Sequence, residues 1–430
     1  MIKIKPFIEH VSYCEQCHKK LKNNQILWQG IHVCVEMNCE DCGAHYIEDL
    51  PVGHATYFPY KVNLSEDKIF GEKKGLKWLG QPFLNSLKNP EKDTKINLMV
   101  NKKVSQLGKA VVVINTIDYL YGHSLLKLLN VQREAEENQD KYIVVIVQKA
   151  LEWMVPEDVS EIWTVNISFK QARSYFPSLN DAINAELLRF NEIFISHAYS
   201  HPNKFNIEKF TRTLRYEESK FISPRISFIW REDRLWLKNV YVSKAIQKLG
   251  LTGIFLSPFL YIQKRKVISL FKKLKRELPS FQYTVVGLGQ SCRFPNWIND
   301  ERVSAFNKET ELRICGIYSE SKVVIGVHGS NMLLPSAHAE MVVDIMPIDR
   351  WGNFAQDILF QESEDSRLTS YKYRFIPIEI NLKILSKIIS RQINNYQHYK
   401  MQMSEDTVNN INWESKRLLS GDAISFAEQL

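Results

Sequence analysis

The sequence has no hydrophobic run that approaches the roughly 20 residues needed to cross a bilayer. Its longest apolar runs, such as Tyr142 to Val147, have the length of a strand. The N-terminus lacks a continuous apolar core followed by a small-residue cleavage site, so no secretory signal is expected. We therefore expect a cytoplasmic protein without a transmembrane segment, with peripheral attachment to a membrane left open.

Three short motifs of nucleotide chemistry are also missing. No G-x-G-x-x-G follows a predicted strand, because Gly287-Leu-Gly289 lacks the third glycine, and no G-x-x-x-x-G-K-[ST] occurs. Dinucleotide oxidoreductases and P-loop NTPases are thereby disfavoured. The absence of a D-x-D triplet counts against glycosyltransferases of the single-domain, metal-dependent kind.

The composition is that of a globular protein. Hydrophobic residues make up 44% and charged residues 24% of the chain, with only 17 Gly and 15 Pro, which excludes collagen-like and disordered classes. A length of 430 residues predicts two or three domains. The net charge of +8 comes from Lys and Arg spread along the chain, so a pyrophosphate-bearing ligand suits it as well as nucleic acid does.

Cysteine is concentrated at one end of the chain. Five of the seven cysteines lie within the first 42 residues, and four of them form the pairs Cys14-Glu-Gln-Cys17 and Cys39-Glu-Asp-Cys42. Two such C-x2-C turns supply four thiolates to one tetrahedral zinc ion. The segment 26–34 between them alternates as a hairpin strand does, which is typical of a zinc ribbon.

The zinc is expected to be structural, because four protein ligands leave no open coordination position. It would stabilise a module of about 60 residues that is too small to fold well alone. The exact ligand set stays open at this point. Substitute ligands are available at His18, His32, Cys34 and His45.

From about residue 96, apolar runs alternate with amphipathic stretches, which predicts parallel β-α units. The pattern breaks once and resumes at Arg225, so we expect two successive open α/β sheets with a ligand cleft at the carboxyl ends of their strands. Helices are predicted from Ser124, over about 261–278 and over 382–400. The predicted strands are 110–115, 142–148, 161–165, 192–195, 226–230, 283–287, 323–327 and 341–345.

The segment 321–347 carries the most chemistry. A buried strand ends in His328-Gly329-Ser330-Asn331, and the residues that follow are predicted to start a helix. Gly329 allows a sharp turn, so the amides of Ser330 to Met332 would form an anion site suited to a diphosphate. Asp344, at the end of the next strand, is a candidate acceptor for ribose or sugar hydroxyls.

This segment resembles the C-terminal signature of glycosyltransferase family 61, which has a His-Gly-Ala-Gly loop, a Pro soon after and a Glu-x-x-Pro on the next strand. His328, Gly329, Pro335 and Pro347 match, whereas Ser330, Asn331, Leu334 and Asp344 replace the family's Ala, Gly, Asn and Glu. Two further stretches are similar to the family, namely 226–234, which ends in Arg231 and Arg234, and the aromatic-His segment 118–127. The resemblance covers about residues 96–380 and leaves out the zinc module.

The resemblance implies a GT-B fold, in which two Rossmann-like domains face a cleft and the second domain binds most of a nucleotide-sugar donor. It also implies inverting transfer to an acceptor hydroxyl with no metal at the catalytic centre. The acceptor class stays open between a glycan, a lipid-linked molecule and a protein. The expected boundaries are 1–60 for the zinc-ribbon-like module, 61–95 for a linker, 96–221 for the acceptor-side domain, 222–380 for the nucleotide-sugar domain and 381–430 for a helical segment.

Individual residues can be assigned candidate roles in this transfer reaction. Without a metal, the leaving diphosphate needs cations, and Arg231 and Arg234 are the candidates; the alternative is an ion-pair network with Glu232 and Asp233. His123 is the first candidate for the general base, because its ordinary pKa lies near neutrality, and Asp118 is the second. The alternative for His123 is a histidine satisfied in the core.

Two other functions remain open at this stage. A zinc ribbon on a basic chain would also suit a nucleic-acid-binding protein whose α/β domains only act as a scaffold, although nucleic acid is the less expected partner. A nucleotide-sugar epimerase can have the same architecture, but it would need catalytic carboxylates on both sides of the cleft.

Overall fold

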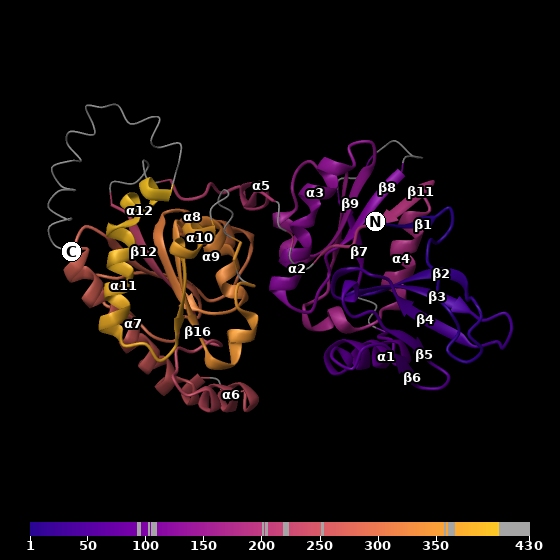
Figure 1. The fold of residues 1–430 in the computed structure, drawn as a ribbon, viewed down its shortest axis with the longest axis horizontal. Coiled ribbons are helices and arrows are strands. Elements are labelled where there is room, and N and C mark those ends of the chain that lie inside the picture. The colour runs from indigo at the N-terminus through magenta and orange to yellow at the C-terminus, as the bar shows by residue number, and fades with distance from the viewer. Residues whose placement is uncertain are drawn as a thin grey trace. The chain divides into compact units, whose positions relative to one another are not determined.

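A computed structural model describes residues 1–92, 96–101, 104, 110–199, 202, 205–217, 223–250, 253–356, 358–359 and 366–403. The chain divides into two compact units, Met1–Thr213 and Leu214–Leu430, which we call unit 1 and unit 2 (Figure 1). It is a mixed α/β protein, and three sheets form in the described residues. None of the described helices is both long and apolar enough to cross a membrane.

Unit 1 begins with an antiparallel sheet in the order β2-β3-β4-β5-β6. The hairpin of β2 and β3 forms where the sequence predicts it, with Leu27 opposite Cys34. The buried side chains of this antiparallel sheet include Trp28, Val33 and Tyr46. The strands are β2 (Lys22–Gln29), β3 (His32–Asn38), β4 (His45–Asp49), β5 (Lys61–Asn63) and β6 (Lys68–Phe70).

The segment 61–95, which the sequence predicts to be a linker, is part of this folded module where it is described. It contributes β5 and β6 to the sheet and continues into a π-helical turn, η2 (Leu76–Gly80), and helix α1 (Gln81–Lys88). Its glycines lie close to Tyr60, since a Cβ atom on Gly71, Gly75 or Gly80 would come within 2.5, 2.4 and 2.8 Å of the Tyr60 side chain. Glycine is therefore required here for close packing rather than for flexibility.

The second sheet of unit 1 has the order β1-β11-β8-β9-β10-β7. Its four central strands are parallel, while the edge strands β1 and β7 pair antiparallel with β11 and β10. The first residues of the chain thus complete the α/β sheet instead of belonging to the zinc module alone. The strands are β1 (Ile2–Lys5), β7 (Leu98–Asn101), β8 (Ala110–Asn115), β9 (Tyr142–Gln148), β10 (Glu161–Val165) and β11 (Glu192–Ile195).

Helices and 3-10 turns connect these strands. The amphipathic stretch from Ser124 forms two short helices instead of one. The elements are η1 (Gly53–Thr56), α2 (Tyr121–Leu128), α3 (Asn130–Glu137), η3 (Lys149–Met154), η4 (Lys170–Arg173), α4 (Pro177–Leu187) and α5 (Ile207–Thr211).

Unit 2 contains one fully parallel sheet in the order β14-β13-β12-β15-β16-β17. Numbered along the chain, this is the order 3-2-1-4-5-6 of doubly wound sheets. The topological switch point therefore lies between β12 and β15, where such sheets bind ligands at their carboxyl edge. The strands are β12 (Arg225–Arg231), β13 (Gln282–Leu288), β14 (Asn299–Val303), β15 (Ser321–Val327), β16 (Met341–Met346) and β17 (Tyr373–Pro377).

Helices cover this sheet. The long helix α7 packs against α11 (Figure 1), and the predicted helix 382–400 is divided in two at Asn395. The elements are α6 (Val240–Lys248), η6 (Gly253–Phe255), α7 (Ser257–Glu277), α8 (Lys308–Ser319), η7 (Ser330–Met332), α9 (Leu333–His338), η8 (Ile348–Asn353), α10 (Ser366–Lys372), α11 (Leu382–Asn394) and α12 (Tyr396–Met403).

Candidate functional site

A cationic pocket lies at the carboxyl edge of the unit 2 sheet. Its walls come from the residues that follow β12, β15, β16 and β17 and from α6, which places it at the switch point between β12 and β15. It contains four Lys or Arg side chains, one His and a single carboxylate, so its charge favours an anion. The polar and charged lining residues are Arg234, Lys238, Ser243, Lys244, His328, Asp349 and Arg350.

Arg234 and Gly329 fit together in this pocket. The guanidinium Nη1 of Arg234 donates a hydrogen bond of 3.0 Å to the carbonyl oxygen of His328. Gly329 has a φ of 147°, and a Cβ atom there would lie 2.0 Å from that Nη1 atom. Only glycine can occupy this position while Arg234 stays where it is, so the glycine of the predicted motif has a steric cause.

A buried network holds His328. Its Nδ1 lies 2.8 Å from Oδ2 of Asp344, and the same oxygen accepts a hydrogen bond of 3.0 Å from the Tyr373 hydroxyl. Both His328 and Asp344 are almost completely buried. A carboxylate accepts only, so Nδ1 carries a proton and the orientation of the ring is fixed. Asp344 thus positions His328, and its burial does not favour the predicted contact with ribose or sugar hydroxyls.

Arg231 and Arg234 are not equivalent. Arg231 makes two hydrogen bonds, of 2.8 and 2.7 Å, to the carboxylate of Asp233, and Glu232 accepts two from Ser291. Arg231 is therefore engaged in the local ion pair that was the alternative to phosphate binding. Arg234 is the one that lines the pocket.

The helix expected after Gly329 is shorter than predicted. Ser330 and Asn331 lie in the 3-10 turn η7, and α9 adds only six residues. The side-chain amide of Asn331 donates to the carbonyl oxygen of Val327 at 3.1 Å, which ties the turn to β15. So short a helix has little dipole, and the cationic side chains dominate the charge of the pocket.

A second polar cluster lies in unit 1, where β8 leads into α2. Nε2 of His54 and Nδ1 of His123 share a hydrogen bond of 2.9 Å. The carboxylate of Asp118 lies 3.4 Å from that His54 nitrogen and 3.6 Å from that His123 nitrogen. On its other side, Nζ of Lys127 lies 2.9 Å from Asp118 Oδ2 and donates to the carbonyl oxygen of Ile117. The predicted pair His123 and Asp118 is therefore brought together, with two further partners.

The buried charges of Asp118 and Lys127 in this cluster balance each other. Burial would raise the pKa of Asp118, but the charge of Lys127 and the two neighbouring histidines hold that pKa well below its usual range. Burial lowers the pKa of His54, although Asp118 acts in the opposite direction. Asp118 is therefore ionised and His54 neutral at pH 7. The His123 side chain is the most exposed of the four, at 29%.

Sequence reasoning missed His54 and Lys127. Lys127 carried a signal, because it stands four residues after His123 and so lies on the same side of the predicted helix. His54 carried none. It stands 64 residues before Asp118 in η1, and only the tertiary fold brings it to α2.

His54, Asp118 and His123 also have the spacing of metal ligands. Two imidazoles and a carboxylate are common ligands for divalent transition metals. An ion here would, however, lie next to the fully buried ammonium of Lys127, which already compensates the charge of Asp118. Repulsion at this distance in a low-dielectric interior disfavours a cation.

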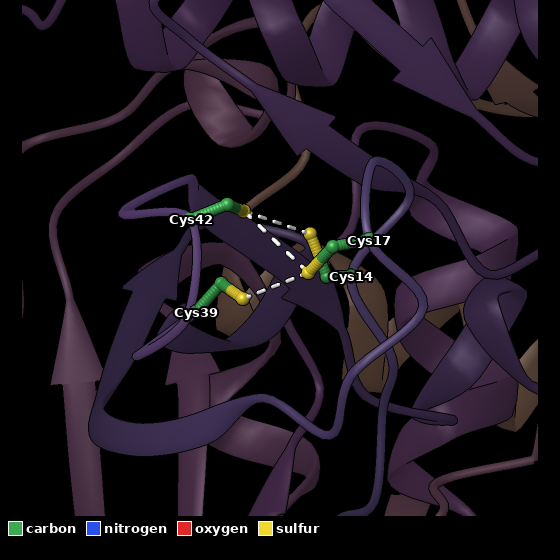
Figure 2. Close-up of side chains that lie close together, drawn as sticks. All are labelled: Cys14, Cys17, Cys39 and Cys42. Atoms are coloured by element: carbon green, nitrogen blue, oxygen red, sulfur yellow. Dashed lines mark hydrogen bonds between the residues drawn. The ribbon is translucent and has the colours of Figure 1, made fainter.

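The four predicted metal ligands lie together, before the start of β2 and after the end of β3 (Figure 2). They are Cys14, Cys17, Cys39 and Cys42. Sγ of Cys17 lies 3.3 Å from that of Cys39 and 3.7 Å from that of Cys42, and Sγ of Cys14 lies 3.5 Å from that of Cys42. Tetrahedral zinc with Zn–S bonds of about 2.3 Å separates its sulfurs by about 3.8 Å. The cluster could therefore hold a metal ion with little movement, and the same sulfurs are too far apart for disulfides.

Three of the four substitute ligands are engaged elsewhere. His32 is buried against Asp49 at 2.6 Å, and His45 pairs with Glu36 at 2.8 Å. Cys34 lies fully buried within β3, where burial raises the pKa of its thiol. His18 has a φ of 59° and lies in the first C-x2-C turn, where its amide donates to the carbonyl oxygen of Cys14.

Comparisons with known proteins gave three distant structural likenesses. No family model and no curated protein matches the chain. The pneumococcal O-GlcNAc transferase GtfA in complex with UDP and GlcNAc is 10% identical, with a TM-score of 0.26 over 87% of this chain and 64% of that chain. A GtfA/B complex is 11% identical, with a TM-score of 0.24 over 91% of this chain and 65% of that chain.

The Gap123 glycosylation-associated complex of Streptococcus agalactiae is 9% identical, with a TM-score of 0.26 over 94% of this chain and 80% of that chain. This chain spans just under two thirds of each of the first two. TM-scores of this size do not establish a shared fold. We therefore argue function from the site geometry alone.

Proposed function

We propose that the protein is a glycosyltransferase that moves a sugar from a nucleotide-sugar donor to an acceptor hydroxyl, with inversion and without a metal ion at the chemical step. The observation that carries this proposal is the cationic pocket at the switch point of the unit 2 sheet. Doubly wound sheets bind nucleotides at this point. A pocket with four Lys or Arg side chains supplies the charge that a metal ion would otherwise bring to a diphosphate.

Unit 2 would bind the donor diphosphate. Arg234, Lys238 and Arg350 offer donors to its oxygens, and His328 is held in a fixed orientation by Asp344. As the bond between the anomeric carbon and the diphosphate breaks, its electron pair moves to the diphosphate. These cations stabilise that developing charge. Arg231 has a lesser role in this scheme because Asp233 already occupies it.

Unit 1 would supply the general base. Asp118 lies beside Nδ1 of His123, which favours a proton on that nitrogen and leaves Nε2 to accept the proton of the acceptor hydroxyl. The oxygen that loses this proton then bonds to the anomeric carbon. His54 is neutral and hydrogen-bonded to His123, so it orients the same ring. The four cysteines would hold a structural zinc that stabilises the module carrying His54.

Donor binding can be tested with the two arginines as a matched pair. The thermal unfolding midpoint of the full chain is measured with UDP, GDP, CMP and dTDP and with their sugars. We expect at least one nucleoside diphosphate to raise the midpoint of the wild type and of Arg231→Ala, whereas Arg234→Ala should lose most of that rise. Loss of a charge-assisted phosphate contact corresponds to about 1.5–3 kcal/mol of binding energy.

Catalysis is tested with the nucleotide that binds. His123→Ala should retain donor binding but lose transfer, since the base acts only in the chemical step. If no nucleotide stabilises the protein, or if Arg231→Ala and Arg234→Ala behave alike, the assignment of the unit 2 pocket to a donor is wrong.

A further inference from the structure

Unit 2 contains a long stretch without acidic residues. From Arg234 to Arg276, with both ends counted, there are eleven Lys or Arg residues and no Asp or Glu, whereas the whole chain has 56 basic and 48 acidic residues. Part of the net charge of the protein is therefore gathered in α6, η6 and α7. A solvent-exposed helix ordinarily mixes both signs of charge, so this stretch favours an anionic partner.

Large apolar side chains are exposed on the same elements. On α6, the exposed residues Tyr241, Lys244 and Lys248 are spaced by three and four, which places them on one side of the helix, and the exposed Leu249 directly follows its end. Lys244 also pairs with Asp349 at 3.1 Å. Tyr241 is 80% exposed and Leu249 is 70% exposed. This outer side is thus apolar and cationic where a polar mixture of charges is the norm.

The same combination continues where α7 begins. Phe255 in η6 is 70% exposed, and Tyr261 and Ile262 on α7 are 55% and 44% exposed. One turn further along α7, the guanidinium of Arg265 lies 5.9 Å from the ring centre of Tyr261. The start of α7 therefore presents aromatic, aliphatic and cationic groups within two turns.

These elements share one buried side. Ile246 of α6, Leu256 after η6 and Leu260 of α7 all belong to the hydrophobic core of unit 2. The amide of Leu256 donates to the carbonyl oxygen of Gly253, and that of Leu260 donates to the carbonyl oxygen of Leu256, which joins η6 to α7. The apolar groups on the outer side are consequently not needed for this core, and their exposure calls for another partner.

We propose that the outer side of α6, η6 and the first two turns of α7, which we call the α6–α7 face, binds the surface of an anionic membrane. Its aromatic and aliphatic side chains would enter the headgroup region, and its cations would contact lipid phosphates, as in interfacial amphipathic helices. Nucleic acid fits less well, because bases stack on aromatic rings but gain little from Leu249 and Ile262. The proposal needs no membrane-spanning helix.

The α6–α7 face also meets the cationic pocket. Lys238 and Lys244 line that pocket and belong to the same acid-free stretch. Binding at a membrane would bring the mouth of the pocket close to lipid headgroups. If the proposed transfer reaction holds, this arrangement favours an acceptor carried on a lipid. Membrane binding itself does not depend on the reaction.

Flotation of the full chain with vesicles tests the proposal. We expect binding to phosphatidylcholine vesicles that contain about 30% phosphatidylglycerol and none to phosphatidylcholine alone, with binding weakened by added salt. Lys248→Gln combined with Arg265→Gln should lower the affinity about 25-fold, because each cation near such a surface contributes about a fivefold factor. Leu249→Ser combined with Phe255→Ser should abolish the binding that persists at high salt.

Matched controls come from unit 1. Lys73→Gln with Lys77→Gln removes two exposed cations, and Leu188→Ser removes an exposed leucine, and none of these should change flotation. Equal losses in the control and test variants would overturn the assignment of the face. So would the absence of binding to anionic vesicles, or a pattern in which the α6–α7 substitutions weaken binding to a single-stranded RNA and leave the vesicles unaffected.

Discussion

Each unit holds a buried aspartate next to histidine, and the two differ in how the carboxylate is balanced. Asp118 in unit 1 lies between two histidines and the ammonium of Lys127, which is fully buried. Asp344 in unit 2 has His328 and a neutral hydroxyl from Tyr373 on the same oxygen. Both are completely buried within or just after a strand. The carboxylate of Asp118 is thus balanced by the charge of Lys127, whereas that of Asp344 is balanced by hydrogen bonds.

This difference indicates different tasks. A carboxylate paired with a permanent cation stays ionised and orients its histidine over a wide pH range, which suits a group that serves a general base. Asp344 instead fixes the ring of His328 through a hydrogen bond, and a ring held in one orientation suits a pocket that binds an anion.

The largest effect concerns the metal. The difference between Asp118 and Asp344 holds only if Lys127, and not a metal ion, balances the charge of Asp118. We expect one zinc per chain, lost in Cys39→Ser together with the folded state of the antiparallel sheet, because structural zinc contributes about 10–16 kcal/mol of apparent binding energy. Elemental analysis of His54→Ala should still find one zinc per chain. A second metal that His54→Ala removes would show that the unit 1 cluster is a metal site.

The next effect is the cost of leaving Asp118 without its cation. Lys127→Met should destabilise unit 1 by about 3–5 kcal/mol, because it strands a buried charge. Adding Asp118→Asn should recover part of that loss, and the recovery separates a charge effect from a packing effect. Denaturant midpoints provide the measurement. Lys149→Met is the matched control, because the Lys149 side chain is 58% exposed and its pair with Glu152 should contribute less than about 1 kcal/mol. No recovery in the double variant would contradict the assigned ion pair.

A smaller effect is expected in unit 2. Asp344→Asn should cost about 1.5–3 kcal/mol of stability, since it replaces a charged acceptor of the His328 hydrogen bond. Tyr373→Phe removes the neutral hydrogen bond to the same oxygen and should cost about 1 kcal/mol. We expect only Asp344→Asn to weaken binding of the nucleoside diphosphate that stabilises the wild type. If Tyr373→Phe weakens it equally, the effect of Asp344 does not depend on its hydrogen bond with His328.

Much of the fold could be predicted from the sequence, because buried parallel strands are continuous apolar runs. All eight predicted strands form, most of them with ends within one residue of the prediction. The missed strands include β4, in the middle of the antiparallel sheet, and the edge strand β14, whose sequence Asn-Asp-Glu-Arg-Val is mostly polar and carries no periodic signal. The edge strand β1 is different, because Ile2-Lys-Ile-Lys5 alternates as a half-buried strand does, and this signal was overlooked.

Only part of the candidate site could be predicted from the sequence, because sequence patterns report local structure. His123, Asp118, His328 and Gly329 stand beside strands or in a motif, so local pattern indicates them. Of the partners that decide their chemistry, His54 and Tyr373 are placed by tertiary packing, whereas Lys127 lies one helical turn after His123 on α2. The choice between Arg231 and Arg234 depends on a side-chain conformation, namely the pairing of Arg231 with Asp233. No spacing rule contains that information.

The smallest effect is a pH dependence of unit 1. Burial lowers the pKa of His54 in the folded state, so below about pH 6.5 the unfolded chain takes up a proton that the folded chain does not. Stability from this histidine is therefore present at neutral pH and is lost as the pH falls. His54→Gln should flatten the fall in the denaturant midpoint between neutral and mildly acid pH, whereas the exposed His398→Gln should leave it unchanged. A fall that is identical in wild type and His54→Gln would mean that His54 is protonated in the folded protein, and the neutral orienting role assigned to it beside His123 would have to be given up.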